Sequence, residues 1–339
     1  MNDSLTPERK ALRESIKGLS RFTYTGELTK ELVEDIVAAA PEVQILTLEL
    51  LEDTSFDLSD LRDLAALLIL NINEGPNLKQ ISLKDIQKLK WLTAIEININ
   101  PGESIEEIDL TPLTNHPELT VVTIAGAIKK LKGLEALKTL SNLNSVGFYS
   151  LDVEELNLRA LSGSKNLESI YLGDMGPEKP TKPYRILLPQ NIPIKIFEAS
   201  ECYSEDLVLD IDFTFLEGKE SLDSLSLVNC NLTSFDFSVL RPLKRIGKID
   251  LSNNKITHLD ITPILEMPMF TEKALGEPPF VVDEDVVIQI AKTSEQDAID
   301  IIGRQDKIID DHNGSFAIEY EFGHKWLKNT IDSHTVEWI

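Results

Sequence analysis

Cysteine is scarce in this sequence, with two residues in a chain of 339. Two cysteines cannot build a disulfide framework, so we expect a reducing, cytoplasmic setting. Long apolar runs are missing as well, since none approaches the ~18 residues that a membrane-spanning helix needs. The opening residues, MNDSLTPERK, lack the apolar stretch of a signal peptide. The sequence therefore predicts a cytoplasmic chain that is neither secreted nor embedded in a membrane.

Positive charge is also in short supply. The chain has 33 Lys and Arg against 57 Asp and Glu, a formal net charge of -24 at pH 7. Binding to nucleic acid or to an anionic membrane surface depends on basic residues, so the composition argues against both partners. The acidity would attract a basic protein partner, and it would equally serve solubility. Composition alone leaves these two explanations open.

Catalytic and metal-binding motifs are absent from the sequence. It contains neither the G-x-x-x-x-G-K-[ST] loop that cradles phosphates nor the G-x-S-x-G turn that presents a nucleophilic serine. No histidine has another His or Cys at metal-ligand spacing; the five are His116, His258, His312, His324 and His334. The adjacent Asp310, Asp311 and His312 are more typical of a solvated turn than of a metal site. We expect no enzyme activity, no cofactor and no metal.

What the sequence has in abundance is a repeat. In LKRIGKIDLSNNKITHLDITPI, Leu243 to Ile264, the residues follow the spacing L-x-x-L-x-L-x-x-N-x-L-x-x-L. A second signature, of the form IDLTPL, recurs at separations of 24, 25, 27 or 30 residues, starting at Phe56, Ile81, Ile108, Lys132, Leu156, Ile186, Ile211, Phe235 and Leu259. Each unit predicts a short strand with alternate residues buried, and successive strands should stack in parallel.

These motifs resemble the intracellular leucine-rich repeat family over about two thirds of the chain. The period of about 24 residues is similar in style to long archaeal and bacterial repeats. The resemblance implies an α/β fold: a right-handed leucine-rich-repeat horseshoe solenoid whose parallel sheet forms a concave, usually protein-binding face. We expect a helical N-terminal cap at 1–42, about nine repeats at 43–270, and a C-terminal α+β cap or small appended module at 271–339.

Both ends of the chain depart from the repeat. TPERKALRESIKGL and TKELVEDIVAAA predict two helices, N-capped by Thr6 and Thr29, that cover the N-terminal end of the core. Near the C-terminus, DVVIQI predicts a strand, TSEQDAIDII a helix and Asn313-Gly314 a β-hairpin. This last pattern fits a cap that covers the final repeat, and it fits a separate interaction module equally.

The ninth position of the family's repeat is Asn or Cys, and the resemblance implies a structural role for it. The side chain there lies inside the turn after each strand and satisfies backbone groups. The residues in this structural ladder are Asn100, Cys202, Cys230 and Asn254. We therefore expect the two cysteines to be buried structural residues rather than nucleophiles. Neighbouring ladder positions would lie ~5 Å apart, but side chains that point the same way suit a disulfide poorly.

The strand positions that face outward define a candidate binding surface. Its middle is nearly uncharged, with two tyrosines on adjacent predicted strands, each placed to cover a glycine of the next strand. This pattern predicts an aromatic platform for a partner or, alternatively, simple cover for bare glycines. The candidate partner-binding residues are Glu96, Asn98, Thr123, Gly147, Tyr149, Tyr171, Glu198, Ser226 and Asp250.

A second candidate contact is the segment GPEKPTKPYR, Gly176 to Arg185, which is locally basic on an acidic chain. Its proline content predicts an extended surface loop, with Lys182, Tyr184 and Arg185 as the contact residues. The alternative is a surface insertion that the fold tolerates without using it.

Together these features predict a non-enzymatic scaffold that binds a protein partner, basic if charge guides it, on the concave face. The alternative is a regulatory subunit of an enzyme such as a small GTPase or a phosphatase. Such a regulator would need a positioned Asn or Arg that reaches the partner's site. No arginine falls at the predicted concave positions, so the scaffold is favoured.

Overall fold

A computed structural model describes residues 5–51, 53, 55–74, 77–99, 105–153, 155–175, 185–202, 210–265, 280–294, 296, 298, 326–327 and 329–339. The chain forms two compact units. The N-terminal unit comprises Met1–Glu168, Met175–Glu178 and Asn191–Pro193. The C-terminal unit comprises Ser169–Asp174, Lys179–Gln190 and Ile194–Ile339.

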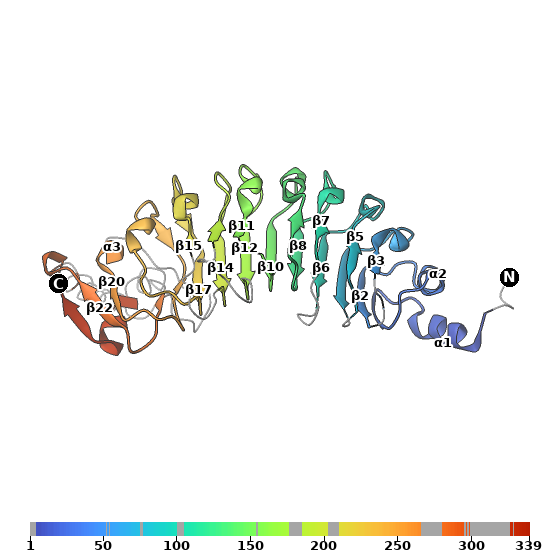
Figure 1. Cartoon of the computed structure of the whole chain (residues 1–339), viewed down its shortest axis with the longest axis horizontal. Helices are drawn as coiled ribbons and strands as arrows, with labels where there is room; N and C mark the ends of the chain where they lie inside the picture. Colours follow the sequence, from blue (N-terminus) through green and yellow to red (C-terminus); the bar gives the residue numbers. More distant parts are fainter. Residues whose placement is uncertain are drawn as a thin grey trace, which may run out of the picture. The chain divides into compact units, whose positions relative to one another are not determined.

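Parallel strands, one from each repeat, form the sheet of the N-terminal unit (Figure 1). In order they are β1 (Arg21–Thr25), β2 (Ile45–Leu50), β4 (Ile69–Glu74), β6 (Ala94–Asn98), β8 (Val121–Ala125) and β10 (Ser145–Tyr149). Each residue lies beside its equivalent one repeat later, as Thr47 lies beside Asn71 and Asn71 beside Glu96. Alternate residues such as Leu46 and Leu48 are fully buried. This is a leucine-rich-repeat solenoid, which confirms the predicted fold class.

From β2 onward, the back of each repeat in this unit is a short strand followed by a 3₁₀ helix of three to six residues. The strand and helix pairs are β3 (Ser55–Asp57) with η1 (Leu58–Leu61), β5 (Gln80–Ser82) with η2 (Ile86–Lys88), β7 (Ile108–Asp109) with η3 (Thr111–Leu113), β9 (Leu131–Lys132) with η4 (Leu134–Thr139), and β11 (Glu155–Asn157) with η5 (Leu158–Leu161). The IDLTPL signature therefore encodes the back of the repeat, while the L-x-L core encodes the sheet.

The second residue of that signature holds the 3₁₀ turn in place. The Asp109 carboxylate accepts a hydrogen bond from the backbone N–H of Thr111 at 2.9 Å, two residues on. The same contact recurs from repeat to repeat, with the side chain of Asp57, Asn157, Asp212, Asp236 or Asp260 as acceptor. Asp109 also accepts from Lys132 of the next repeat, and this bond together with the Thr111 contact lowers the pKa of Asp109 to about 2. An Asp or Asn side chain at this position therefore stabilises each of these turns.

The C-terminal unit has the same construction. Its parallel strands are β12 (Ser169–Gly173), β14 (Ile196–Ser200), β17 (Ser224–Val228), β19 (Ile249–Asp250) and β21 (Phe280–Val281). The back carries β13 (Arg185–Leu187), β15 (Asp210–Ile211), η6 (Phe213–Leu216), β16 (Ser221–Leu222), η7 (Phe237–Leu240), β18 (Arg245–Ile246), β20 (His258–Asp260), α3 (Thr262–Leu265), β22 (Val287–Ile290), η8 (Lys292–Ser294) and β23 (Val336–Trp338). Successive phenylalanines pack edge to face inside it, with ring centroids of Phe235 and Phe237 5.0 Å apart.

The repeat register continues past residue 270, where the sequence placed its end. Phe280 of β21 pairs with Ile249, and Ile288 of β22 pairs with Leu259 one repeat earlier. The predicted strand DVVIQI is therefore the back strand of another repeat. The predicted hairpin at Asn313-Gly314 and most of the predicted helix TSEQDAIDII lie outside the described residues.

The N-terminal segment contains both predicted helices and one strand that was not predicted. Thr6 caps α1 (Pro7–Ile16), and Thr29 caps α2 (Lys30–Ala39). Between them, β1 pairs in register with β2, and Arg21 lies 24 residues before its partner Ile45. β1 and α2 therefore form a repeat with an α-helix on its back, inside the range that was expected to hold only a helical cap.

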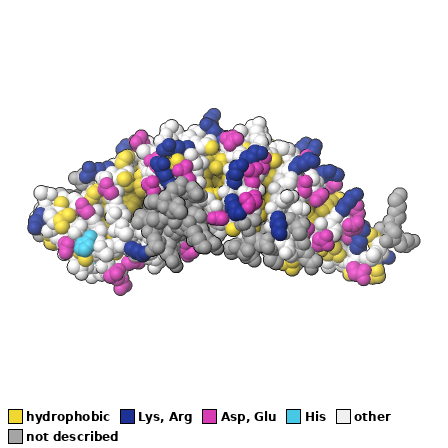
Figure 2. Space-filling view, in the orientation of Figure 1, with side chains coloured by type: hydrophobic (Ala, Val, Ile, Leu, Met, Phe, Trp, Pro, Cys, Tyr) yellow, Lys and Arg dark blue, Asp and Glu magenta, His cyan; other side chains and the backbone are white. Residues whose placement is uncertain are grey.

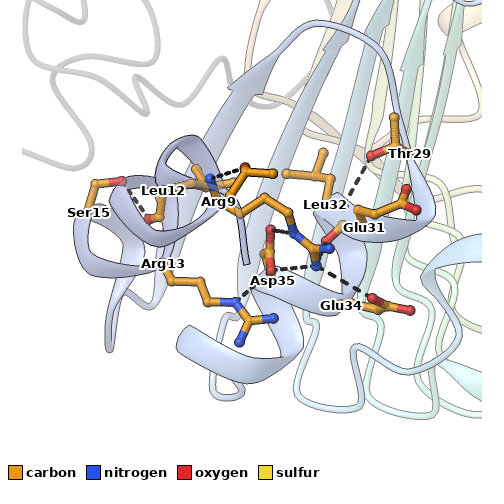
Figure 3. Close-up of polar contacts among 10 residues, drawn as sticks. Arg9, Leu12, Arg13, Ser15, Thr29, Glu31, Leu32, Glu34 and Asp35 are labelled. Atoms are coloured by element: carbon orange, nitrogen blue, oxygen red, sulfur yellow. Dashed lines mark hydrogen bonds and ion pairs between the residues drawn. The ribbon is translucent and has the colours of Figure 1, made fainter. Parts of the chain in front are cut away.

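A buried carboxylate joins the two helices (Figure 3). Asp35 of α2 is 1 % exposed and accepts hydrogen bonds from Arg9 of α1 at 2.8 Å from both Nε and Nη2. Arg13 Nε donates to the same carboxylate at 2.6 Å. Burial acts to raise the pKa of Asp35, but the two guanidinium groups outweigh it and hold the pKa below its usual range. Two charge-assisted contacts therefore fix α1 onto α2.

We expect Asp35→Asn to destabilise the protein by about 3–5 kcal/mol, because it leaves two guanidinium groups without their shared buried counter-charge. The matched control is Glu34→Gln, since Glu34 is largely exposed and lies 3.5 Å from Arg9. Exposed pairs contribute only about 0–1 kcal/mol. Urea unfolding of the three proteins measures the difference. Equal losses of stability from the two substitutions would contradict this account of the Arg9–Asp35–Arg13 contact, which we call the clasp.

His116 is the one histidine that the described core buries, at 1 % exposure. Its Nε2 lies 3.1 Å from the Leu89 carbonyl oxygen, and its Nδ1 lies 3.4 Å from the backbone N–H of Glu118. The first contact needs a donor and the second an acceptor, so the neutral ring satisfies both. Burial lowers the pKa of His116 from its ordinary value of 6.5.

Stability should therefore fall as the pH falls below 6.5. Above that pH both the folded and the unfolded chain hold a neutral ring; below it the unfolded chain takes up a proton that the folded chain resists. The loss levels off below the folded pKa. We expect His116→Gln to remove this part of the pH dependence in urea unfolding between about pH 5 and 8, and the exposed His258→Gln to leave it unchanged. An identical slope for wild type and His116→Gln would refute the assignment.

Candidate functional site

The open face of the N-terminal sheet presents three parallel rows of side chains. The residues lie in register from β1 to β10, one per strand. The first row is Arg21, Ile45, Ile69, Ala94, Val121 and Ser145. The second is Thr23, Thr47, Asn71, Glu96, Thr123 and Gly147. The third is Thr25, Glu49, Asn73, Asn98, Ala125 and Tyr149. All but Gly147 are partly or fully exposed, so an apolar stretch in the first row borders two polar rows.

Hydrogen bonds between neighbouring strands hold the polar rows in place. Thr25 donates to Glu49 at 2.6 Å, and Asn71 Nδ2 donates to Thr47 at 3.2 Å. In the third row Asn98 Nδ2 donates to Asn73 Oδ1 at 2.9 Å. Side chains fixed before a partner arrives lose less conformational entropy on binding. The face is therefore preorganised rather than mobile.

The middle of this face has an excess of hydrogen-bond acceptors. Asn71 Oδ1 is buried and has no hydrogen-bond partner. Its neighbour in register, Glu96, makes no hydrogen bond or ion pair with the part of the chain that the structure describes. A buried acceptor without a donor costs free energy that a donor can restore. The chemistry of this spot fits a cationic or N–H donor.

Gly147 and Tyr149 contact each other within β10. A Cβ added to Gly147 would lie 2.9 Å from Tyr149 Cε2 and 3.2 Å from Thr123 Oγ1. A ring from its own strand, two residues on, thus covers Gly147. This contact favours the structural explanation for Tyr149, cover for a bare glycine. The predicted cover of Gly147 by Tyr171 of the next strand stays a prediction.

The C-terminal unit presents its own face, with Tyr171, Glu198, Ser226 and Asp250 in register on four successive strands. Its acidic residues are partly satisfied within the unit. Ser224 donates to Glu198 at 3.1 Å, and Lys248 pairs with Asp250 at 3.3 Å. The nine predicted contact residues therefore divide: five lie on the N-terminal sheet and four on the C-terminal sheet.

The structural ladder is visible at three of its four predicted positions; Asn100 lies outside the described residues. Asn254 Oδ1 accepts from the backbone N–H of Cys230 and of Leu232, both at 3.0 Å. Its Nδ2 donates to the carbonyls of Leu227 and Leu251, both at 2.7 Å. One asparagine side chain thereby satisfies backbone groups of two adjacent repeats.

Both cysteines are free thiols that are 0 % exposed. Cys230 Sγ lies 3.4 Å from the Val228 carbonyl, and Cys202 Sγ lies 3.4 Å from the Ser200 carbonyl. A hydrogen bond with Cys202 lowers the pKa of Cys230, although burial opposes it. The thiols donate to the strand ends and are sealed from solvent.

Sequence reasoning missed β1 and named no candidate residue on β4. Arg21 is an arginine on the open face, where none was expected, and Asn71 and Asn73 bring two amides to it. The signal for β1 was the 24-residue distance from Arg21 to Ile45, with apolar residues at 22 and 24. Of the predicted contact loop, Lys182 and Tyr184 lie outside the described residues; Arg185 is exposed and pairs with Asp210 at 3.4 Å.

Ion pairs also join successive repeats on the surface of the N-terminal unit. Lys129, Lys130 and Lys132 each pair with an acidic residue of the preceding repeat, namely Glu106, Glu107 and Asp109. Figure 2 shows basic and acidic side chains gathered over this part of the N-terminal unit. Among the described residues, no group of three or more His, Cys, Asp or Glu could hold a metal ion. Every helix in the described part is too short or too polar to cross a bilayer.

Comparison with known proteins yields a structural likeness alone. No family model and no curated protein matches the chain. A solved structure that is similar is the Toll–Spatzle complex, described as a molecular hub in Drosophila development and innate immunity. The identity is 18 %, the TM-score is 0.49, and the match covers 86 % of this chain and 42 % of that one.

We expect both thiols to resist a maleimide in the native protein and to react quickly in denaturant, because only the thiolate in contact with reagent is nucleophilic. Ser200→Cys provides the control, since residue 200 is exposed on β14 and should label within minutes under the same conditions. Intact-mass spectrometry counts the adducts. Rapid native labelling of Cys202 or Cys230 would show that the ladder opens.

Proposed function

We propose that this protein is a non-enzymatic scaffold in the cytoplasm, and that the open face of its N-terminal sheet binds a protein partner. The observation that carries the proposal is the set of three in-register rows, two of which cross-strand hydrogen bonds hold in place before any partner binds. Two free thiols that no disulfide joins support the cytoplasmic setting. Of the nine residues predicted from sequence, five lie on this face: Glu96, Asn98, Thr123, Gly147 and Tyr149.

The chemistry of the face favours a basic partner. Glu49 and Glu96 are its acidic residues, and Arg21, its one basic residue among the three rows, lies on the outermost strand. The acceptor pair of Asn71 and Glu96 suits a lysine or arginine side chain, which carries donors alone. Ile45, Ile69 and Val121 would contact apolar side chains that flank it. The net charge of -24 adds long-range attraction for the same partner.

The test compares wild type and three folded variants as baits in native lysate. Glu96→Arg and Thr123→Arg place a cation in the middle row, and we expect each to lose the partner that wild type retains, through loss of the acidic acceptor and through charge repulsion. Glu135→Arg, on the exposed back of η4, makes a matched charge change away from the face and should retain it. Circular dichroism confirms that each variant is folded.

Crosslinking followed by mass spectrometry then locates the contact on the bait. Crosslinks to the row residues would support the proposal. A partner that all four proteins capture equally, or crosslinks confined to the back of the repeats, would overturn it.

A further inference from the structure

In the part of the chain that the structure describes, β1 has a neighbouring strand on one side only. It begins the sheet order, with β2 beside it. The backbone of Ser20 accepts from Ile45 N at 3.0 Å, and Gly26 N donates to the Glu49 carbonyl at 3.0 Å. Backbone groups alternate in direction along a strand, so those of Phe22 and Tyr24 also point to β2. The N–H and C=O groups of residues 21, 23 and 25 therefore point away from the sheet, and no described residue bonds to them.

Among the described residues, this edge lacks the features that usually protect one. Proteins blunt exposed edge strands with lysine, proline, bulges or a covering segment. The sequence of β1, RFTYT, has none of the first three and is rich in residues that favour strands. Both helices lie elsewhere: α1 packs on α2, which forms the back of the repeat, as the clasp of Arg9, Arg13 and Asp35 shows (Figure 3).

The apolar side of β1 is also incompletely covered. Phe22 and Tyr24 point inward with their rings in contact, centroids 6.3 Å apart, yet both remain partly exposed. The equivalent residues of the next strand, Leu46 and Leu48, are 0 % exposed. Leu19, just before β1, is 40 % exposed. Backbone groups without a described partner and exposed apolar side chains thus occur together at β1. This combination is expected where another strand extends the sheet.

We propose that β1 pairs antiparallel with β1 of a second copy of this chain, about a two-fold axis at Thr23. In that register Arg21 lies opposite Thr25, and Thr23 opposite Thr23, so all the outward groups form hydrogen-bonded pairs. Phe22 then lies opposite Tyr24 of the other copy, in the close pairing position where aromatic pairs stabilise a sheet. This one register pairs the backbones of three residues from each copy and also forms two aromatic pairs.

Charge complementarity selects a second copy over other occupants. Arg21 is exposed and opposes Thr25, whose hydroxyl already holds the Glu49 carboxylate at 2.6 Å. The Arg21 guanidinium of one copy therefore faces Glu49 of the other, and the symmetry makes this contact twice. The dimer joins the six strands of one N-terminal sheet to six of another and leaves both open faces unobstructed.

Sedimentation velocity of the full chain from about 1 to 200 µM tests the proposal. An interface of this small size should give a micromolar dissociation constant that weakens with salt. Thr23→Pro removes an outward N–H and no bond to β2, and it should weaken the dimer at least about tenfold. Arg21→Glu faces Glu49 with a like charge and should weaken it about tenfold or more. Adding Glu49→Arg to Arg21→Glu restores the pairing with the charges exchanged.

Arg62→Glu, an exposed charge change on the back of η1, is the matched control and should leave the dissociation constant unchanged. Hydrogen exchange provides a second measurement: the amides of residues 21, 23 and 25 should be slow at high concentration and fast at low concentration. A monomer throughout the concentration range overturns the proposal, and the partner of the β1 edge would then be a different protein. A dimer that neither Thr23→Pro nor Arg21→Glu weakens also overturns it, because its interface lies elsewhere.

Discussion

The structure depends on the in-register pairing of equivalent residues in successive repeats. No repeat here can bury its own leucines, because each contributes one short strand, one turn and a narrow apolar strip. Pairing at a constant register brings those strips together, and the fully buried Leu46, Leu70 and Ile95 of three consecutive strands show the result. The same register fixes the polar rows on the opposite side of the sheet. Core and candidate binding face are thus two consequences of one constraint.

Much of the fold could be predicted from the sequence, because a constant register requires the same residue types to recur at a fixed period. Alternating leucines marked the strands, and the IDLTPL signature marked the turns between them. The positions of Cys230 and Asn254 were placed correctly within the turn because a side chain there must serve the backbone of two repeats, and few residue types can do so. Where each position of the repeat has a physical requirement, the sequence pattern alone predicts the structure.

The sequence was less informative where a repeat uses different residues for the same job. β1 turns Phe22 and Tyr24 inward in place of leucines, and its back is the α-helix α2, so the amphipathic helix pattern obscured the strand before it. In β4 the run of asparagine and isoleucine fits two frames one residue apart, and a shift of one residue moves every side chain to the other face. The placement of the Tyr149 ring over Gly147 depends on a rotamer, which no spacing encodes.

The turns of the repeat have a consequence for the acidity of the whole molecule. An aspartate that caps a 3₁₀ turn recurs in repeat after repeat, as in Asp57, Asp109 and Asp236. Hydrogen bonds lower the pKa of Asp109 and of Asp236 and so favour their charged forms. Every added repeat of this kind brings one more fixed negative charge. Part of the low isoelectric point, about 4.6, is therefore a by-product of chain length and turn chemistry rather than a property selected for recognition. Asn157 caps its turn in the same way. Replacing the capping aspartates by asparagine would therefore raise the isoelectric point and keep the turns.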